Sequence, residues 1–373
     1  MLYVLLPLIA QAFGLNYAQV GLIRTANRAA MSALQLPAGM LAERYGERLL
    51  LVAGTACAGF GFLALGYSTG FVAILLSLFV AGCGGAFQHP LSSSMISRVY
   101  PQAGRRTALG VYNFAGDVGK VSVAGLIGLM IAAGYDWQAP VLTLGWVTLA
   151  CAAMVWILLA AAGTGAQPSR EHRQHVAATQ TGWGLRNRQG FVALCAIEVI
   201  DGMTRTGFLT FVAFLMLAKG MPDGWAVLSV PLVAAGGMAG KLACGLLAER
   251  YGTVRTIVVT EIASAAGIIL VVALPGAFAY FVLPLVGVAL NGTSSALYGT
   301  VGDLVEPERV SRAFGLFYTL GSASGVVAPV AYGLLADQVG VSAAMLAAAA
   351  IVTLTIPLCL WLSTSLGRTR QYV

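Results

Sequence analysis

Charged residues are scarce in this chain. They make up 9% of its 373 residues, whereas 58% of the residues are apolar. This composition excludes a water-soluble globule of the same size, because too little polar surface is available to cover it, and it indicates that lipid is the solvent. In lipid every backbone polar group needs an internal partner, which restricts the apolar runs to helices or barrel strands. The runs are mostly ~18 to 28 residues long, which suits membrane-spanning helices, and the alternating segments of a barrel are absent.

Signatures of an enzyme or a metalloprotein are also missing from the sequence. The six cysteines fall inside apolar runs without CxxC or Cys/His spacing, which is typical of small packing residues. No nucleophile–base–orienter set, metal-ligand spacing or phosphate-cradling loop occurs. We therefore predict no enzymatic activity, no cofactor and no metal.

The apolar runs predict twelve helices. They cover residues 1–13, 17–38, 49–68, 71–97, 106–133, 137–162, 189–218, 224–244, 256–275, 277–302, 309–336 and 341–365. The first is too short to cross a bilayer, roughly 20 Å at 1.5 Å per residue. We expect the given chain to start inside this truncated helix, since a cleaved signal peptide, the alternative, would need a charged start and a small-residue cleavage site.

Basic residues set the predicted orientation. Arginines occupy the connections after the second, fourth, eighth and tenth helices, the 163–188 linker and the C-terminus, whereas the opposite connections carry only Lys219. The positive-inside rule places the arginine-rich face, the linker and the C-terminus in the cytoplasm. The net charge of +7 thus reports topology, and no nucleic-acid partner is expected.

A ten-residue pattern occurs once in each half of the chain. Gly39-Met-Leu-Ala-Glu43-Arg44-Tyr-Gly46-Glu-Arg48 follows the second predicted helix, and Gly245-Leu-Leu-Ala-Glu249-Arg250-Tyr-Gly252-Thr-Val follows the eighth. The repeat predicts a duplicated bundle with two pseudo-symmetric six-helix halves, 1–162 and 189–373, joined by the 163–188 linker. The glycines of both copies suit a tight turn between helices.

The first copy is similar to the signature of the major facilitator superfamily, usually written G-x-L-a-D-r-x-G-r-r, and a weaker second copy is also a habit of that family. The resemblance covers essentially the whole chain. It implies that the acidic residue contacts a neighbouring helix and that the arginines lock the cytoplasmic side. The matching residues of this gate are Glu43, Arg44, Arg48, Glu249 and Arg250, framed by glycines 39, 46, 245 and 252. Glutamate replaces the usual aspartate in both copies, and it should still reach a helix N-terminus or an arginine.

Three further stretches are informative: Gln88-His89-Pro90-Leu-Ser-Ser-Ser, Ala108-Leu-Gly110-Val-Tyr112-Asn113 and Arg205-Thr-Gly207-Phe-Leu-Thr-Phe211. They are similar to the bacterial efflux branch that includes fosmidomycin-resistance proteins, and this resemblance implies a multi-pass protein of the bacterial inner membrane. Two features of the family's drug/proton antiporters are missing. The fourth helix has no central arginine, and the fifth has Gly116-Asp117-Val-Gly119-Lys120 in place of G-P-x-x-G-G.

Seven ionisable residues lie deep in predicted helices, and each costs roughly 2.5 to 3.5 kcal/mol unless it is paired or faces water. They are Arg24, Arg28, Asp117, Lys120, Glu198, Asp201 and Arg205. In the second helix Arg24, Asn27 and Arg28 share one face. The guanidinium fork suits a carboxylate, phosphate or phosphonate, so we predict contact with an anionic substrate. Structural pairing and steering at the outer mouth are the alternatives.

Further charges suggest how transport is coupled. Asp117 and Lys120 can pair with each other, or Lys120 can be a second anion ligand with Asp117 as a switchable partner. Asp201 and Arg205 form a natural i,i+4 pair, which leaves Glu198 without an intrahelical cation. A desolvated carboxylate without a partner favours its protonated form, so Glu198 is the first candidate proton carrier and Asp201 the second. The alternative for Glu198 is a structural role near the cytoplasmic gate.

Several weaker candidates complete the predicted site. His89 precedes a helix-kinking proline and could exchange protons, although a packing role is equally open. Arg205 and four polar residues at cavity depth could bond a substrate: Tyr112, Asn113, Asn291 and Tyr298. Lys241 and Glu261 are interpreted as snorkelling or structural. Glycines 110, 116, 119, 125 and 128 of the fifth helix are expected to let neighbouring helices approach closely.

These features favour a monomeric secondary transporter that exports a small organic anion by alternating access, in exchange for protons. Two alternatives remain. One is proton-driven efflux of apolar or cationic drugs, which the family habit and the acidic residues of the seventh helix favour. The other is a non-transporting scaffold or sensor, which has no evident need for seven buried charges.

Overall fold

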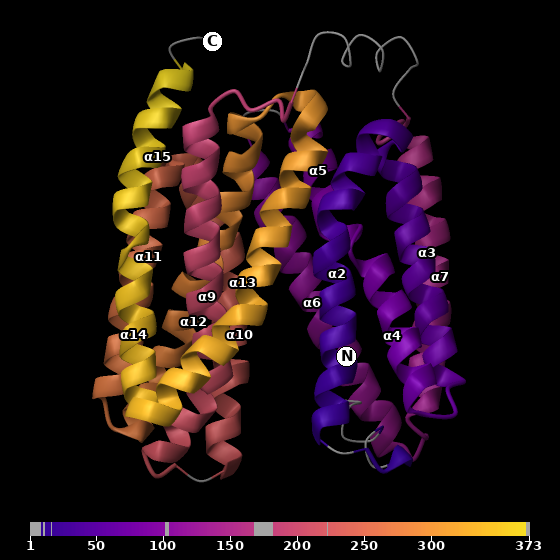
Figure 1. Ribbon diagram of the computed structural model, residues 1–373, viewed down its shortest axis with the longest axis horizontal. Helices are drawn as coiled ribbons and strands as arrows, with labels where there is room; N and C mark the ends of the chain where they lie inside the picture. Colours follow the sequence, from indigo (N-terminus) through magenta and orange to yellow (C-terminus); the bar gives the residue numbers. More distant parts are fainter. Residues whose placement is uncertain are drawn as a thin grey trace. The chain divides into compact units, whose positions relative to one another are not determined.

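The structure is a computed structural model that describes residues 9, 12–15, 17–100, 104–167, 182–221 and 223–370. Within these ranges the chain is almost entirely helical (Figure 1), and ten helices are long and apolar enough to cross a membrane. The predicted all-α membrane fold is therefore confirmed. Most of the predicted first helix and the centre of the 163–188 linker lie outside the described residues.

The helices fall into two runs along the chain. The first run is α2 (Tyr17–Tyr45), α3 (Glu47–Gly66), α4 (Phe71–Gly85), α5 (Gln88–Val99), α6 (Arg105–Ala132) and α7 (Gln138–Ala161). The second is α9 (Arg188–Ala218), α10 (Asp223–Tyr251), α11 (Thr253–Ala273), α12 (Gly276–Leu304), the 3₁₀ turn η1 (Pro307–Arg309), α13 (Val310–Val339), α14 (Val341–Thr353) and α15 (Thr355–Arg370). Two of the ten spans are composite, α4 with α5 and α14 with α15.

Prolines explain both composite spans. The fourth predicted helix, 71–97, breaks at Ala86 and Phe87. Pro90 has no N–H to donate to the carbonyl of Ala86, so the α-helical ladder loses a hydrogen bond at this point. The last helix breaks at Leu354, and there Pro357 cannot donate to the carbonyl of Thr353.

The chain packs into two compact units that interleave along the sequence. The first contains Met1–Met95, Asp117–Gly184 and Glu308–Thr319, and the second contains Ile96–Gly116, Leu185–Pro307 and Leu320–Val373. As a result α6 and α13 each contribute residues to both units.

In the first unit α3 packs against both α4 and α7 (Figure 1). Small residues permit this close packing. A Cβ atom added at Gly61 would lie 2.6 Å from the backbone nitrogen of Ala81, and one added at Gly54 would lie 2.8 Å from the carbonyl oxygen of Gly84. Because these glycines have no side chains, the backbones of α3 and α4 can come into contact. Small residues at helix contacts are common among helices that associate in lipid.

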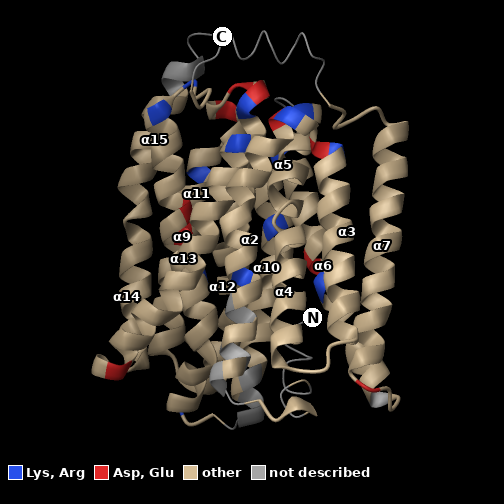
Figure 2. Cartoon of the chain, turned by 45° about the vertical axis from the view of Figure 1, so that its right-hand side comes forward, with Lys and Arg blue, Asp and Glu red and all other residues tan. Residues whose placement is uncertain are grey.

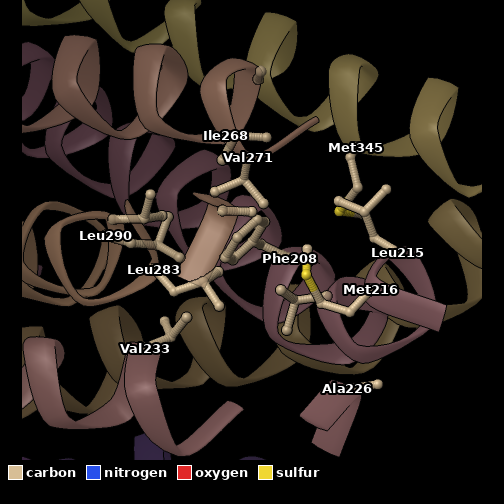
Figure 3. Close-up of a cluster of buried hydrophobic side chains, with 14 residues drawn as sticks. Phe208, Leu215, Met216, Ala226, Val233, Ile268, Val271, Leu283, Leu290 and Met345 are labelled. Carbon is tan, nitrogen blue, oxygen red and sulfur yellow. The ribbon is translucent and has the colours of Figure 1, made fainter. Parts of the chain in front are cut away.

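In the second unit α12 packs against α10 and α11, and α9 packs against α14 and α15. Figure 3 shows an apolar cluster of this unit, in which the ring of Phe208 lies among side chains from α11 and α12, including Val271 and Leu283. Phe208, Val271 and Leu283 are fully buried. This packing fixes α9 against the helices that carry the other charges of the unit.

The two signature copies are helix ends rather than turns. Helix α2 continues through the first copy to Tyr45, and α10 continues through the second to Tyr251. One glycine then separates each helix from the next, Gly46 with φ 83° and Gly252 with φ 91°. The turn role is thus confirmed for these two glycines, because a positive φ favours glycine. It was wrong for Gly39 and Gly245, which lie inside helices at contacts described below.

The glycines of α6 also differ from the prediction. A Cβ atom added at Gly110 would lie 2.9 Å from the carbonyl oxygen of Lys241, so close approach is confirmed there. At Gly116, Gly119, Gly125 and Gly128, no atom among the described residues would lie within 4 Å of an added Cβ. The expected close helix contact was wrong at these four positions.

Candidate functional site

Charged residues lie mainly at helix ends (Figure 2), and α4 and α7 carry none along their lengths. The exceptions deep in the helices define the candidate site. Those in the second unit are mainly carboxyl groups, whereas those in the first unit are Arg28 of α2 and the residues Asp117 and Lys120 of α6.

Helix α9 places three ionisable residues on one face at steps of three and four. Asp201 is fully buried, and its Oδ2 lies 3.3 Å from Nη1 of Arg205, so the predicted i,i+4 pair is confirmed. Glu198 is 2% exposed, and its Oε2 has no hydrogen-bond partner among the described residues. Its other oxygen lies against Gly321 of α13. Glu198 therefore lacks the local cation that Asp201 has, as the sequence predicted.

A third carboxyl group from α11 belongs to the same cluster. Glu261 is 1% exposed and interacts electrostatically with Asp201, Arg205 and Glu198. Neither of its oxygens has a hydrogen-bond partner among the described residues. Snorkelling was therefore the wrong interpretation, because the side chain is buried in the bundle instead of reaching toward the membrane surface. The position of Glu261 near the middle of an apolar helix was the signal that could have identified it.

Two further predicted ligands lie on α12 of the second unit. Tyr298 is close enough to interact electrostatically with Glu198, Asp201 and Arg205, so it borders the carboxyl cluster. Asn291 instead donates its Nδ2 to the carbonyl oxygen of Gly287 at 3.3 Å and lies against Gly237 of α10. Its amide therefore takes part in helix packing.

The polar face of α2 is divided between packing and exposure. Asn27 donates its Nδ2 to the carbonyl oxygen of Leu78 at 2.8 Å, which ties α2 to α4. Arg28 is exposed and makes no ion pair with any residue that the structure describes. The side chain of Arg24 lies outside the described residues. Arg28 is thus an available guanidinium within a helix of the bundle.

The two charges deep in α6 pair with each other. Lys120 Nζ lies 2.7 Å from Oδ1 of Asp117, which confirms the i,i+3 pair, and the lysine side chain remains 68% exposed. Asn113 is buried and donates to the carbonyl oxygen of Leu109 at 2.8 Å. Its neighbour Tyr112 is half-buried. Lys120 therefore keeps surface available for a ligand, whereas the amide of Asn113 is engaged in its own helix.

His89 lies in an aromatic contact. Its ring centroid is 5.6 Å from that of Tyr318 on α13, and the hydroxyl of Tyr318 is hydrogen-bonded to Ser93 at 2.8 Å. This contact favours a packing role for His89, and its proton-coupling role stays a prediction.

At the first signature copy, Glu43 binds two arginines. Its Oε2 lies 2.5 Å from Nη1 of Arg309 and 2.7 Å from Nη2 of Arg312, at the start of α13. Helix α2 can come this close because Gly39 has no Cβ. A Cβ added there would collide with the carbonyl oxygen of Ser311. The predicted contact of the acidic residue with an arginine of another helix is confirmed.

A second buried acid lies beside Glu43. Glu47, in the first turn of α3, accepts hydrogen bonds from the hydroxyls of Ser94 at 3.0 Å and Ser311 at 2.8 Å. These hydroxyls are also 2.8 Å from each other. Sequence analysis missed Glu47, which occupies a position where the signature has a basic residue.

At the second copy the acidic residue binds backbone instead. Glu249 Oε1 accepts the backbone N–H of Arg106 at 2.8 Å, at the start of α6. The side chains of Arg105 and Arg106 pair with Asp303 of α12, the second of them at 2.5 Å. A Cβ added at Gly245 would lie 2.9 Å from the carbonyl oxygen of Arg106. The expectation that glutamate could reach a helix N-terminus is confirmed here.

The signature's own arginines lie against aromatic rings. The guanidinium carbon is 5.4 Å from the ring centroid of Tyr45 for Arg44, 5.2 Å from that of Trp156 for Arg48 and 5.5 Å from that of Tyr251 for Arg250. The ion pairs with Glu43 and Asp303 are made by other arginines, which sequence analysis counted only as basic charge: Arg105, Arg106, Arg309 and Arg312. Their position at helix starts, where the helix dipole disfavours cations, is the signal that could have indicated acidic partners.

A helical membrane bundle with ionisable side chains deep in its helices defines a membrane carrier, since such residues are costly in lipid and mark the paths of substrates and ions. Comparison with known proteins identifies the family. The model of the Major Facilitator Superfamily matches residues 1–329 and, in a second match, residues 224–370. The chain therefore belongs to this superfamily, and it is a multi-pass membrane transporter rather than an enzyme.

Two curated relatives and one solved structure illustrate the similarity. The Uncharacterized MFS-type transporter YfnC of Bacillus subtilis (strain 168) is 25% identical over 94% of this chain and 85% of its own length. The Probable sulfoacetate transporter SauU of Cupriavidus necator is 24% identical over 94% of this chain and 87% of its own length. The crystal structure of FucP in the outward conformation superposes with a TM-score of 0.79 at 16% identity, covering 96% of this chain and 93% of FucP. The last match confirms the fold.

Proposed function

We propose that the protein exports a small organic anion across the bacterial inner membrane, by alternating access and in exchange for protons. In this proposal it works as a monomer, with the 163–188 linker and the C-terminus in the cytoplasm. The arginine-rich face of the sequence supports this orientation. The halves 1–162 and 189–373 would be the parts that rock against each other.

The exposed guanidinium of Arg28 carries the anion assignment. A guanidinium in the middle of a membrane helix costs roughly 2.5 to 3.5 kcal/mol, and no ion pair within the described chain offsets this cost at Arg28. An anion with two adjacent oxygens would offset it through two parallel hydrogen bonds. The relative SauU, by its name a probable transporter of sulfoacetate, supports a carboxylate or sulfonate substrate.

Proton coupling is assigned to Glu198 and Asp201 of α9. Both carboxyl groups are buried, and only one guanidinium, that of Arg205, pairs with either of them among the described residues. Burial and the surplus of carboxyl groups both favour uptake of a proton. The contacts of Glu43 and Glu249 with α13 and α6 are assigned to the gate, as bonds that form in one state and break in the other.

Binding by purified protein tests the substrate class. Sulfoacetate, small phosphonates and small carboxylates are expected to raise the midpoint of thermal unfolding, because a ligand that binds only the folded state stabilises it. The shift should be lost in Arg28→Ala and reduced in Arg28→Lys, which keeps the charge without the planar fork. Arg255→Ala, which removes an exposed arginine at the start of α11, is the matched control and should keep the full shift. Equal shifts in Arg28→Ala and the unmodified protein would remove Arg28 from the site.

The second candidate is proton-driven efflux of lipophilic cations. The surplus of buried carboxyl groups in the second unit favours it, since carboxylates attract cationic drugs. The same thermal measurement decides between the two. Stabilisation by lipophilic cations that is lost in Glu198→Gln but kept in Arg28→Ala would establish this alternative.

A further inference from the structure

The carboxyl cluster of the second unit contains more acid than its cation can neutralise. Asp201 and Arg205 already form a pair, in which the nearest oxygen and nitrogen are 3.3 Å apart. Glu198 and Glu261 add two further buried carboxyl groups within electrostatic range of the same guanidinium. If all three acids were ionised, the cluster would hold two uncompensated negative charges inside the protein, which is very costly.

Glu261 makes neither an ion pair nor a hydrogen bond within the described chain. It is the acid that comes from a second helix, α11, which packs against α9, α10, α12, α14 and α15. Among the described residues, the titratable groups close enough to interact with it are Asp201, Arg205 and Glu198 of α9 and the thiol of Cys359 on α15. Both of its oxygens are buried and lack a hydrogen-bond partner among the described residues.

A structural role does not account for this arrangement. A buried polar side chain contributes to stability when it is hydrogen-bonded. Thr260, the residue before Glu261, is an example, because its hydroxyl bonds to the carbonyl oxygen of Thr256 and to the hydroxyl of Thr293. Glu261 makes no such bond within the described chain, so an apolar or neutral residue of similar size would stabilise α11 better. Residues that reduce stability in this way are typical of functional sites.

We propose that Glu261 holds the exchangeable proton in this conformation and that Arg205 changes partner between α9 and α11 when the proton moves. In the conformation described here, Glu261 is a protonated carboxyl group and Arg205 pairs with the carboxylate of Asp201. In the other, the O–H bond of Glu261 breaks and its proton forms an O–H bond on Asp201. Arg205 then pairs with the carboxylate of Glu261, so the total charge of the cluster is unchanged.

This exchange would link protonation to helix position. The pair within α9 leaves α11 free of ionic contact with α9, whereas a pair between Arg205 and Glu261 would draw the two helices together. Release of the proton to water then occurs from Asp201, where the O–H bond breaks and the carboxylate forms. The inference rests on the proposed proton coupling and adds α11, through Glu261, to the elements that carry it.

The protonation state can be measured without a substrate. The carbonyl stretching band of protonated carboxyl groups is recorded by infrared spectroscopy on the protein reconstituted in lipid at neutral pH. We expect Glu261→Gln to lose the intensity of one such group, and Asp136→Asn, at an exposed turn, to lose none. Glu261→Gln should also unfold at the same or a higher temperature, since it removes no hydrogen bond. An unchanged band, or a lower unfolding temperature, would overturn the inference.

Transport assays distinguish the role inferred for Glu261 from the proposed proton coupling on which it rests. In proteoliposomes with sulfoacetate as the probe, we expect Glu261→Gln to keep anion exchange at equal pH and to lose anion accumulation driven by a pH gradient. If Glu261→Gln accumulates sulfoacetate as the unmodified protein does, Glu261 does not carry the proton. If the unmodified protein shows no response to the gradient while it exchanges sulfoacetate, proton coupling itself fails.

Discussion

The two copies of the signature use the same acid for different bonds. Glu43 binds the side chains of Arg309 and Arg312 in the first unit. Glu249 binds the backbone N–H of Arg106 in the second, where the arginine side chains are held by Asp303 instead. One ten-residue pattern thus produces a side-chain ion pair in one place and a helix cap in the other.

The difference comes from the helix that each copy meets. The η1 turn carries Arg309 and α13 carries Arg312, whereas α6 starts directly at Arg105 with Asp303 close by. Asp303 takes both guanidinium groups, so Glu249 is left with the backbone donor. A motif therefore fixes where the acid stands, and the partner helix decides what the acid binds.

The largest effect is expected at Asp303. Asp303→Ala removes the carboxylate that holds Arg105 and Arg106, and the side chain of Arg105 is only 3% exposed. Breaking a buried ion pair by removing one partner costs about 3 to 5 kcal/mol. Hydrogen–deuterium exchange should show faster exchange at the start of α6, with no change at the start of α13. Equal protection in both proteins would mean that Glu249 alone holds this helix end.

Glutamine substitutions compare the two acids directly. Glu43→Gln removes the negative charge from two hydrogen bonds with guanidinium groups, for which we expect a loss of about 1.5 to 3 kcal/mol in the protection of α13. Glu249→Gln keeps an oxygen that can still accept the backbone N–H of Arg106, so its loss should be about 0.5 to 1 kcal/mol in the protection of α6. Both are measured by hydrogen–deuterium exchange. Equal losses would show that the two copies bind alike.

Much of this comparison was accessible from the sequence. The repeat, the helix spans and the pairs Asp201–Arg205 and Asp117–Lys120 follow from periodicity, because i,i+3 and i,i+4 neighbours share a helix face. Contacts between distant helices were not accessible in this way. Which helices pack together decides the partners of Glu43, the roles of Asp303 and Glu47, and the burial of Glu261. The helical periodicity of the sequence does not show that packing.

The two signature copies can also be compared by the space around their first glycines, Gly39 and Gly245. An added Cβ at Gly39 would collide with the carbonyl oxygen of Ser311, whereas at Gly245 it would lie 2.9 Å from the carbonyl oxygen of Arg106. We expect Gly39→Ala to destabilise the protein by about 1 to 3 kcal/mol, as overpacking does, and Gly245→Ala to cost less. Unfolding in mixed micelles measures both. The comparison fails if Gly245→Ala is the more harmful change.

The smallest effect is expected where the linker meets α13. The guanidinium carbon of Arg312 lies 5.7 Å from the ring centroid of Trp183, and Nη1 of Arg312 donates to the carbonyl oxygen of Gly182 at 3.2 Å. Trp183→Leu removes the ring but leaves the backbone acceptor, so the expected loss is about 0.5 to 1 kcal/mol in the protection of residues 182–187. Trp183→Phe keeps an aromatic face and should recover part of it. A loss as large as that of Glu43→Gln would mean that the linker, more than the acid, holds Arg312 in place.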